Sequence, residues 1–199
     1  KPTIYYRDKY LDYVDAIIPR IGASVTFYGC AVVRQFEMMN IFSTVSSDSI
    51  IRSRDKLRSF QHLSKGGIDM PKTVFTNYSR DVNEVIDHVG GTPVVIKLLE
   101  GTQGLGVVLA ESKNAAESVL EAFNGLQARA LVQEYISEAK GVDIRALIVD
   151  WQVIGAMKRI GKPGEFRSNL HRGGTFEYYR MSEPELKIAI KSARQLKLP

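Results

Sequence analysis

Residues 94–110, VVIKLLEGTQGLGVVLA, combine a lysine with a glycine-rich loop between two apolar runs that are typical of β-strands. Lys97 lies on the first run, and the loop carries Gly101, Gly104 and Gly106. Glycines let the backbone approach a ligand closely and adopt positive φ, and their N–H groups can form a nest for anions. A lysine at the strand end adds a point charge for phosphate oxygens. The stretch therefore predicts a phosphate-binding site, and a plain hairpin with a flexible tip is the alternative.

The order of residues around this loop excludes three common phosphate-binding arrangements. A P-loop needs its lysine directly after the last glycine, but Val107 follows Gly106. A dinucleotide-binding fold needs G-x-G-x-x-G leading into a helix, whereas G-x-x-G-x-G here leads into the β-type run VVLA. Protein kinases carry their lysine on a strand after the glycine loop, and Lys97 precedes it. The remaining arrangement is a β-hairpin flap whose incoming strand carries the lysine.

A second candidate site lies in residues 132–149, VQEYISEAKGVDIRALIV, where one predicted strand ends and the next begins. A purine ring needs a backbone edge for hydrogen bonds and apolar sides for stacking, and the linker residues Glu134, Tyr135 and Ile136 supply both. Asp143 opens the next strand and can accept the two ribose hydroxyls as a bidentate carboxylate. The alternative for Glu134 and Asp143 is that each is a solvated residue at a strand end.

A third candidate site is the glycine-flanked loop GEFRSNLHRGG, residues 164–174. From Lys158 to Gly174 there are five Lys or Arg residues against one Glu. Arginine forks suit phosphate and carboxylate groups, and Asn169 is a polar donor or metal ligand. The alternative is a solvated basic loop, with His171 structural or facing solvent. Taken together, the three stretches each supply a different part of one nucleotide site.

Hydrophobic periodicity predicts the elements that position these residues. Helices are predicted at 27–39, 52–67, 82–89, 116–123 and from a capping box at Ser182 and Glu185 onward. Strands are predicted at 15–18, 42–45, 71–75, 93–98, 107–110, 130–135, 143–149 and 153–159, with a tight turn at Asp150 and a loop over 160–176. This mixture, with hairpins in it, predicts an α+β fold with antiparallel pairing.

The composition indicates a soluble globular chain. It has 199 residues, of which 44% are hydrophobic and 25% charged, and its net charge of +5 suits a polyanionic partner such as a nucleotide, nucleic acid or acidic peptide. No apolar run approaches the roughly 18 residues that a membrane helix needs, and the polar start carries no signal peptide. The single cysteine, Cys30, excludes an internal disulfide and is interpreted as a small buried side chain. We expect a cytoplasmic protein without a membrane partner.

At the three candidate sites the chain resembles the ATP-grasp superfamily, and most closely the RimK-type ligases, which add glutamate to the C-terminus of a small-subunit ribosomal protein. The stretches that carry the resemblance are RSRDKLRSFQHL, VVIKLLEGTQGLGVVLAES, LVQEYISEAKGVDIRALIV and FRSNLHRGG, with IPRIGASVTFYG and RQFEMM before them. The resemblance implies an ATP-grasp fold, in which two α+β subdomains clamp ATP, at residues 51–199. It implies that residues 1–50 are the tail of an α/β pre-ATP-grasp domain.

The resemblance also implies an ATP-dependent carboxylate–amine ligase that works through an acylphosphate. It assigns the ATP phosphates to Lys56 and Lys97, the flap to residues 101–106, adenine to Glu134, Tyr135 and Ile136, and ribose to Asp143. It assigns the phosphates and the acyl group to Arg167, Ser168 and Asn169, with Arg145 as a further acylphosphate contact. The implied partners are ATP, glutamate or another amino acid, a protein or peptide C-terminus such as that of a ribosomal protein, and other copies of the chain.

The main departure from the family pattern concerns the expected magnesium or manganese site. The resemblance implies an Asp and a Glu-x-Asn pair near the C-terminus of the domain, and the sequence reaches Pro199 before any such segment. No residue of the chain is therefore assigned to the metal, and the absent initiator Met fits a fragment. Because Mg²⁺ normally neutralises the β- and γ-phosphates, we expect these 199 residues alone to bind ATP weakly and turn over poorly. Full Mg²⁺-dependent ligation by them would contradict this expectation.

Two other functions remain open on the sequence. One is a small-molecule ligase of the lysine-biosynthesis or glutathione-synthetase kind. The other is a non-catalytic module that binds a nucleotide or contacts RNA, which the basic charge would suit. Against RNA, aromatic residues are not interleaved with the basic loop as single-strand binders require, since Tyr178 and Tyr179 follow in a different segment.

Overall fold

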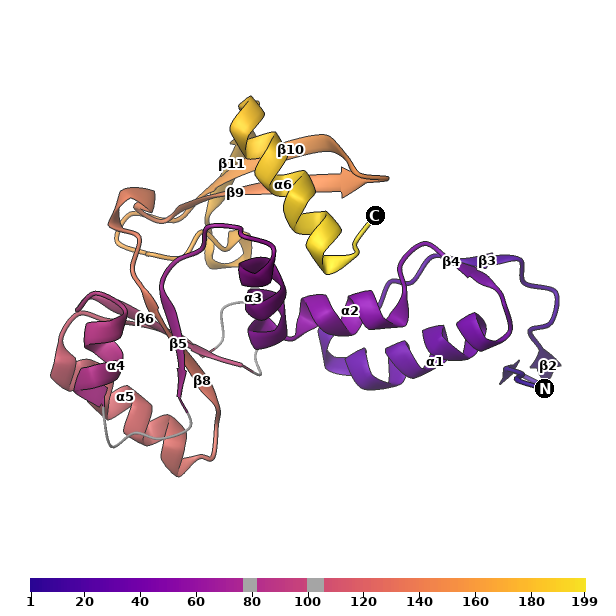
Figure 1. The fold of residues 1–199 in the computed structure, drawn as a ribbon, viewed down its shortest axis with the longest axis horizontal. Coiled ribbons are helices and arrows are strands. Elements are labelled where there is room, and N and C mark those ends of the chain that lie inside the picture. The colour runs from indigo at the N-terminus through magenta and orange to yellow at the C-terminus, as the bar shows by residue number, and fades with distance from the viewer. Residues whose placement is uncertain (77–81, 100–105) are drawn as a thin grey trace. The chain divides into compact units, whose positions relative to one another are not determined.

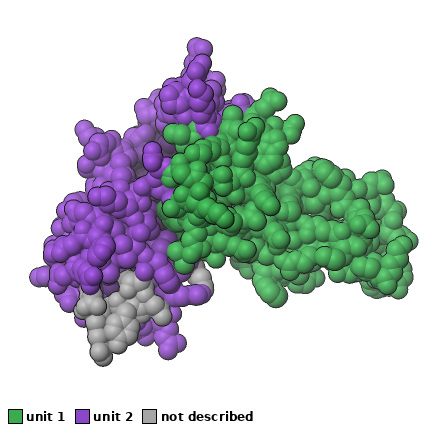
Figure 2. All heavy atoms as spheres, viewed as in Figure 1, with its two compact units in different colours: residues 1–68, 148–152, 188–199 green, residues 69–147, 153–187 purple. Residues whose placement is uncertain are grey.

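The computed structural model describes residues 1–76, 82–99 and 106–199, so Gly101 and Gly104 lie outside the described residues (Figure 1). The chain forms two compact units (Figure 2). Unit 1 comprises residues 1–68, 148–152 and 188–199, and unit 2 comprises residues 69–147 and 153–187. These units group residues by their contacts, so the predicted domain boundary at residue 50 stays a prediction.

Unit 1 is built around three helices. Its elements in chain order are β1 (Tyr5–Tyr6), β2 (Lys9–Tyr10), β3 (Ala16–Ile17), η1 (Ala23–Val25), α1 (Thr26–Met38), β4 (Phe42–Ser43), α2 (Ser47–Arg54), α3 (Lys56–Lys65) and the later part of α6 (Glu183–Leu196). Strands β3 and β4 pair in parallel. A small core joins Cys30 and Val33 of α1 to Ile50 of α2, which confirms the prediction that Cys30 is buried.

The prediction of one continuous helix over residues 52–67 is wrong, because the chain breaks at Asp55 into α2 and α3. Asp55 has extended backbone angles, with ψ of 108°, and its Oδ1 accepts a hydrogen bond from the Arg58 N–H at 2.9 Å. Aspartate is a preferred N-cap because its carboxylate satisfies a backbone donor that the first helical turn leaves unpaired. The cap therefore starts a second helix inside the stretch that was predicted as one.

Unit 2 contains a four-stranded antiparallel sheet in the order β5-β8-β6-β7. Its strands are β5 (Thr73–Thr76), β6 (Val94–Leu98), β7 (Val107–Ala110) and β8 (Ala130–Glu134). The helices α4 (Val82–His88) and α5 (Lys113–Gly125) lie on one face of this sheet (Figure 1). Alternate strand residues point to this face, and Val94, Ile96, Ala130 and Val132 form the core with the two helices.

The opposite face of the same sheet carries the polar residues. In the register, Lys97 lies opposite Val107 on β7 and opposite Leu131 on β8, while Val95 lies opposite Gln133. Because side chains alternate along a strand, Lys97 and Gln133 point away from the helices. The apolar run of β6 therefore fixes the direction of its single lysine.

A second sheet of unit 2 has the order β11-β10-β9. Its strands are β9 (Val142–Val149), β10 (Gln152–Ile160) and β11 (Thr175–Tyr178). Asp150 and Trp151 both have positive φ, 47° and 63°, which confirms the predicted tight turn. The predicted loop over 160–176 is wrong at its end, because Thr175 and Phe176 begin β11, which pairs with β10. Short 3₁₀ turns, η3 (Ser137–Ala139) and η4 (Leu170–Arg172), lie between the strands.

Helix α6 begins as the capping-box pattern predicts. The Ser182 N–H and the Ser182 hydroxyl each donate to Glu185 Oε2 at 2.7 Å. Across the described ranges, none of the helices combines the length and the apolar character that a membrane crossing needs.

Candidate functional site

A cavity of about 300 Å³ lies within unit 2. Its walls come from β6, β7 and β8, from the segment that joins β8 to β9, and from the loop after β10. The predicted site residues that line it are Lys97, Glu134, Tyr135, Ile136, Asp143, Arg167, Ser168 and Asn169. The three stretches singled out in the sequence therefore meet at one cavity.

The other predicted site residues lie elsewhere. Arg145 is exposed on β9 and is not part of the cavity wall. Lys56 is the first residue of α3 in unit 1, and burial lowers the pKa of its ammonium while the neighbouring Asp55 carboxylate raises it. Gly106, the described end of the glycine loop, has φ of +69° and accepts a hydrogen bond from the Leu98 N–H at 2.8 Å. This bond extends the pairing of β6 with β7 to the end of β6.

Lys97 is held within the cavity by a chain of side-chain hydrogen bonds. Its Nζ donates to Gln133 Oε1. Gln133 is only 5% exposed, and its Nε2 donates to Thr73 Oγ1 at 2.8 Å. The Thr73 hydroxyl in turn donates to the Pro71 carbonyl at 2.8 Å. The ammonium position is therefore set by neighbours on β8 and β5.

The segment from β8 to β9 forms a further wall. Glu134 exchanges hydrogen bonds with the Lys72 backbone, through its own N–H at 2.9 Å and through Oε1 at 2.7 Å. Tyr135 and Ile136 follow, and the chain then turns at Lys140 and Gly141 with φ of 47° and 74°. A Cβ on Gly141 would lie 2.6 Å from the Glu165 carbonyl oxygen, so only glycine allows this approach.

Asp143 is the hub of a polar cluster. Its Oδ1 accepts from Arg159 Nε at 2.7 Å, and its Oδ2 accepts from Arg159 Nη2 and from the buried Ser168 hydroxyl. Burial raises the pKa of Asp143, but the hydrogen bonds from Arg159 and Ser168 and the charges of Arg159 and Arg145 outweigh it and hold the pKa below its usual range. A carboxylate has about four acceptor sites, so three bonds leave room for about one further donor.

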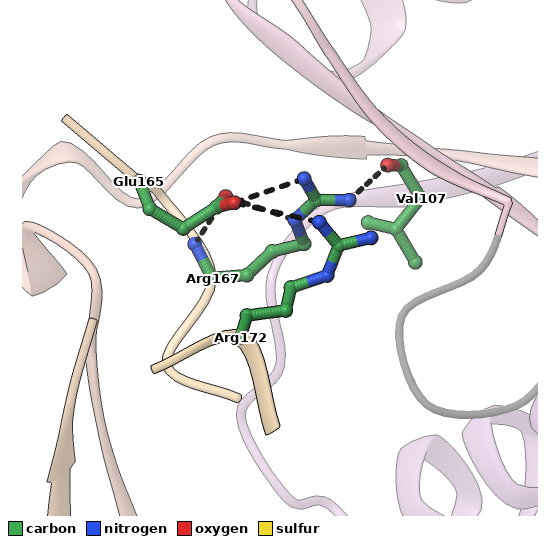
Figure 3. Close-up of polar contacts among 4 residues, drawn as sticks. All are labelled: Val107, Glu165, Arg167 and Arg172. Atoms are coloured by element: carbon green, nitrogen blue, oxygen red, sulfur yellow. Dashed lines mark hydrogen bonds and ion pairs between the residues drawn. The ribbon is translucent and has the colours of Figure 1, made fainter. Parts of the chain in front are cut away.

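A second acidic residue holds the basic loop (Figure 3). Glu165 accepts from Arg167 Nε at 2.9 Å and from Arg167 Nη2 at 3.0 Å, while Arg172 Nη1 lies 3.7 Å from Glu165 Oε2. Arg167 Nη1 donates to the Val107 carbonyl at 3.2 Å, which ties the loop to the first residue of β7. The hydrogen bond from Arg167 is the main cause that lowers the pKa of the Glu165 carboxyl.

Three residues of this site were not predicted from the sequence: Gln133, Arg159 and Glu165. Gln133 lies next to the predicted Glu134, but its contact with Lys97 depends on the register of β8 against β6. Arg159 lies in a strand that was predicted correctly, but its partner depends on how β9 and β10 pack. Glu165 was counted in the sequence only as the single acidic residue among the Lys and Arg residues of 158–174, and was given no role.

Two family models match the chain. The RimK-like ATP-grasp domain matches residues 53–199, and the RimK PreATP-grasp domain matches residues 1–50. The chain is 58% identical over 198 residues to the "Probable alpha-L-glutamate ligase 2" of Shewanella frigidimarina. The match covers 100% of this chain and 66% of that relative's length.

Two solved structures share the fold. The D-alanine–D-alanine ligase from Bacillus anthracis complexed with ATP aligns with a TM-score of 0.70 at 22% identity, covering 93% of this chain and 60% of that one. The RimK domain protein ATP-grasp from Sphaerobacter thermophilus aligns with a TM-score of 0.70 at 22% identity, covering 92% of this chain and 64% of that one. These alignments confirm the predicted α+β ATP-grasp fold. Because one family model alone matches residues 53–199, the chain belongs to the RimK-like ATP-grasp family.

Proposed function

We propose that this chain is the nucleotide-binding part of an ATP-dependent ligase that joins the amine of glutamate to an acceptor carboxylate. The observation that carries the proposal is the cavity in unit 2, where Lys97 faces the linker 134–136 and the arginine loop 167–169. Its volume of about 300 Å³ lies at the lower end of the usual range for small-molecule sites. The name of the Shewanella relative supports glutamate as the amine substrate.

The proposed position of ATP follows from the chemistry of the cavity wall. Adenine lies against Tyr135 and Ile136, where the linker offers a backbone edge and apolar side chains. The phosphates lie between the Lys97 ammonium and the Arg167 guanidinium, with Asn169 as a further donor. Asp143 takes one ribose hydroxyl, since Arg159 and Ser168 already use three of its acceptor sites.

The proposed reaction has two steps. A carboxylate oxygen of the acceptor attacks the γ-phosphorus of ATP, the bond to the bridging oxygen breaks, and ADP leaves. The glutamate amine then attacks the acylphosphate carbon, and the tetrahedral intermediate expels phosphate as the nitrogen loses a proton. A free carboxylate is a poor electrophile, so the phosphate is needed as a leaving group. Lys97 and Arg167 position the phosphates and neutralise charge, which is the main task of a protein in phosphoryl transfer.

The family implies Mg²⁺, whose fit to these residues can be tested. Across residues 1–76, 82–99 and 106–199, no three His, Cys, Asp or Glu side chains gather as a metal site. Asp143 and Glu165, the acidic residues of the polar clusters described above, are each bound by an arginine. The residues in these three ranges therefore do not fit a divalent cation on their own.

We assign the acceptor to the C-terminus of a protein or peptide, such as a small-subunit ribosomal protein. The net charge of +5 supports an acidic or anionic partner. Incubation of the full-length protein with ATP, glutamate and candidate acceptors tests this assignment. Mass spectrometry should show additions of whole glutamyl units to a protein acceptor. Additions to a small amino acid alone would instead favour a small-molecule ligase.

Calorimetry with ATP tests the nucleotide site itself. Lys97→Ala should remove most ATP binding, because it removes the charge that faces the phosphates. Lys113→Ala is the matched control, since Lys113 lies on α5 with its Nζ 2.9 Å from Asp87 and is not part of the cavity wall. Equal ATP affinity of the Lys97 variant and the unmodified protein would count against the proposed site.

A further inference from the structure

We propose that Gln133 is a positioning residue, which fixes the Lys97 ammonium in the orientation that binds phosphate. The inference rests on the proposed function and adds a residue that no sequence motif assigned. It comes from one observation, the continuous hydrogen-bond chain from Lys97 through Gln133 and Thr73 to Pro71.

The direction of every bond in this chain is determined. Lysine has three donors and no acceptor, so Gln133 must turn its oxygen to Lys97. Its amide nitrogen then faces Thr73 Oγ1, which accepts at 2.8 Å and sends its own proton to the Pro71 carbonyl. A flipped amide would set its NH₂ group against the ammonium. The chain therefore has one consistent arrangement.

Burial holds this arrangement in place. Gln133 is 5% exposed, so water cannot replace its partners freely, and an unmade hydrogen bond there is costly. The register places Gln133 opposite Val95, two residues before Lys97 on β6. Diagonal neighbours on an antiparallel sheet are about 7–8 Å apart, which only long side chains bridge. A glutamine and a lysine fit that distance.

The expected effect on binding is pre-organisation. A free lysine side chain populates many rotamers, and ordering it before the ligand arrives removes part of the entropy cost of binding. The amide oxygen of Gln133 orders the Lys97 ammonium without bringing a negative charge next to it. A carboxylate at the same position would order the ammonium and also neutralise it, which would weaken its attraction for phosphate. A neutral acceptor at residue 133 therefore suits an anion site.

A double-mutant cycle on ATP affinity tests the proposal. Gln133→Met keeps the length and removes both polar atoms, and we expect ATP to bind about tenfold more weakly. In the Lys97→Ala background the same change should alter ATP affinity less than about twofold, because the group it positions is gone. A merely structural role would weaken binding in both backgrounds. Gln152→Met, on the exposed start of β10, is the control and should bind ATP as the unmodified protein does.

Thr73→Val is a second variant that keeps the test decisive if Gln133→Met unfolds. Thr73 is not part of the cavity wall, and its hydroxyl accepts from Gln133 Nε2, so the change acts on Lys97 through Gln133. We expect about a threefold loss that disappears in the Lys97→Ala background. If Thr73→Val lowered ATP affinity equally with and without Lys97, or did not lower it at all, this inference would be wrong while the proposed function would stand. An unmodified protein that binds no ATP would overturn the proposed function, and this inference with it.

Discussion

Arg159 and Asp143 form a side-on ion pair across the second sheet of unit 2, with Arg159 Nε 2.7 Å from Asp143 Oδ1 and Nη2 on Oδ2. Arg159 is 13% exposed at its side chain. Because Ser168 donates to the same carboxylate, the pair links β10 to the start of β9 and to the loop at 167–169. The pair therefore holds together the strands β9 and β10 and the loop at 167–169, which all contribute to the cavity wall.

Arg159→Met should therefore destabilise unit 2. The change leaves the half-buried Asp143 carboxylate without its main partner and removes two charge-assisted hydrogen bonds. Hydrogen bonds to charged groups contribute about 1.5–3 kcal/mol each in protected sites, and the partial exposure of Asp143 reduces this, so we expect a loss of about 2 kcal/mol in the free energy of unfolding. Urea denaturation followed by circular dichroism measures it.

The neighbouring Lys158 provides the control for that experiment. Its Nζ lies 3.0 Å from Glu177 Oε1, but both side chains are well exposed, at 36% and 56%. Exposed pairs contribute about 0–1 kcal/mol, so Lys158→Met should change the free energy of unfolding by less than about 1 kcal/mol. Equal losses for the two variants would show that the Arg159 pair has no special structural role.

A pH dependence follows from the lowered pKa of Glu165. The hydrogen bond from Arg167 lowers this pKa, burial raises it, and the charges of Arg167 and Arg172 lower it further. A carboxyl whose pKa is lowered by folding stabilises the protein above its unfolded pKa of about 4.3, and this stabilisation is lost as pH falls through the folded pKa. Glu165→Gln should therefore lower the free energy of unfolding near pH 6 and flatten its decline as the pH falls below the unfolded pKa.

Denaturant titrations at several pH values compare Glu165→Gln with Glu177→Gln. Glu177 pairs with Lys158 on an exposed strand and is the matched control. The free energies of unfolding of the two variants should differ most near pH 6. They should converge at low pH, where Glu165 of the control variant is protonated in both the folded and the unfolded state. Parallel curves for Glu165→Gln and the unmodified protein would contradict the assigned pKa direction.

The fold was largely predictable, because its pattern is local. The apolar runs that begin at residues 94 and 130 and the helical periodicity of residues 113–125 can each be seen in short windows of sequence. The break at Asp55 was missed because a single capping carboxylate starts a new helix inside a run of helix-forming residues. The exposed strands β1 and β2 were missed because they lie in a stretch without an apolar run such as the DAII that contains β3.

The site was predictable only where one residue type carries the signal. Lys97 was identified from its place beside the glycine loop, and it does line the cavity. Its partner Gln133 is 36 residues away, and their contact depends on the register of β6 against β8. Arg159 and Glu165 likewise take their roles from the packing of loops against strands, which short windows of sequence do not contain.

The hairpin that carries Lys97 depends on glycine at residue 106. Gly106 has φ of +69°, and an added Cβ would lie 2.9 Å from Leu98 Cβ and closer still to the end of that side chain. Gly106→Ala should therefore cost about 2 kcal/mol in the free energy of unfolding, through left-handed backbone strain and displacement of Leu98. The Leu98 N–H to Gly106 carbonyl bond of 2.8 Å should weaken as well. Thermal or urea unfolding gives the stability change, and ATP calorimetry shows whether Lys97 moves with its strand.

Gly125→Ala separates this effect from a general response to losing a glycine. Gly125 ends α5, and a Cβ there would meet nothing within 4 Å. Alanine has the higher helix propensity, so this variant should change stability by less than about 0.5 kcal/mol or raise it slightly. If Gly106→Ala proved as harmless as Gly125→Ala, the left-handed turn that closes the β6–β7 hairpin would not be needed to hold Lys97 in the cavity.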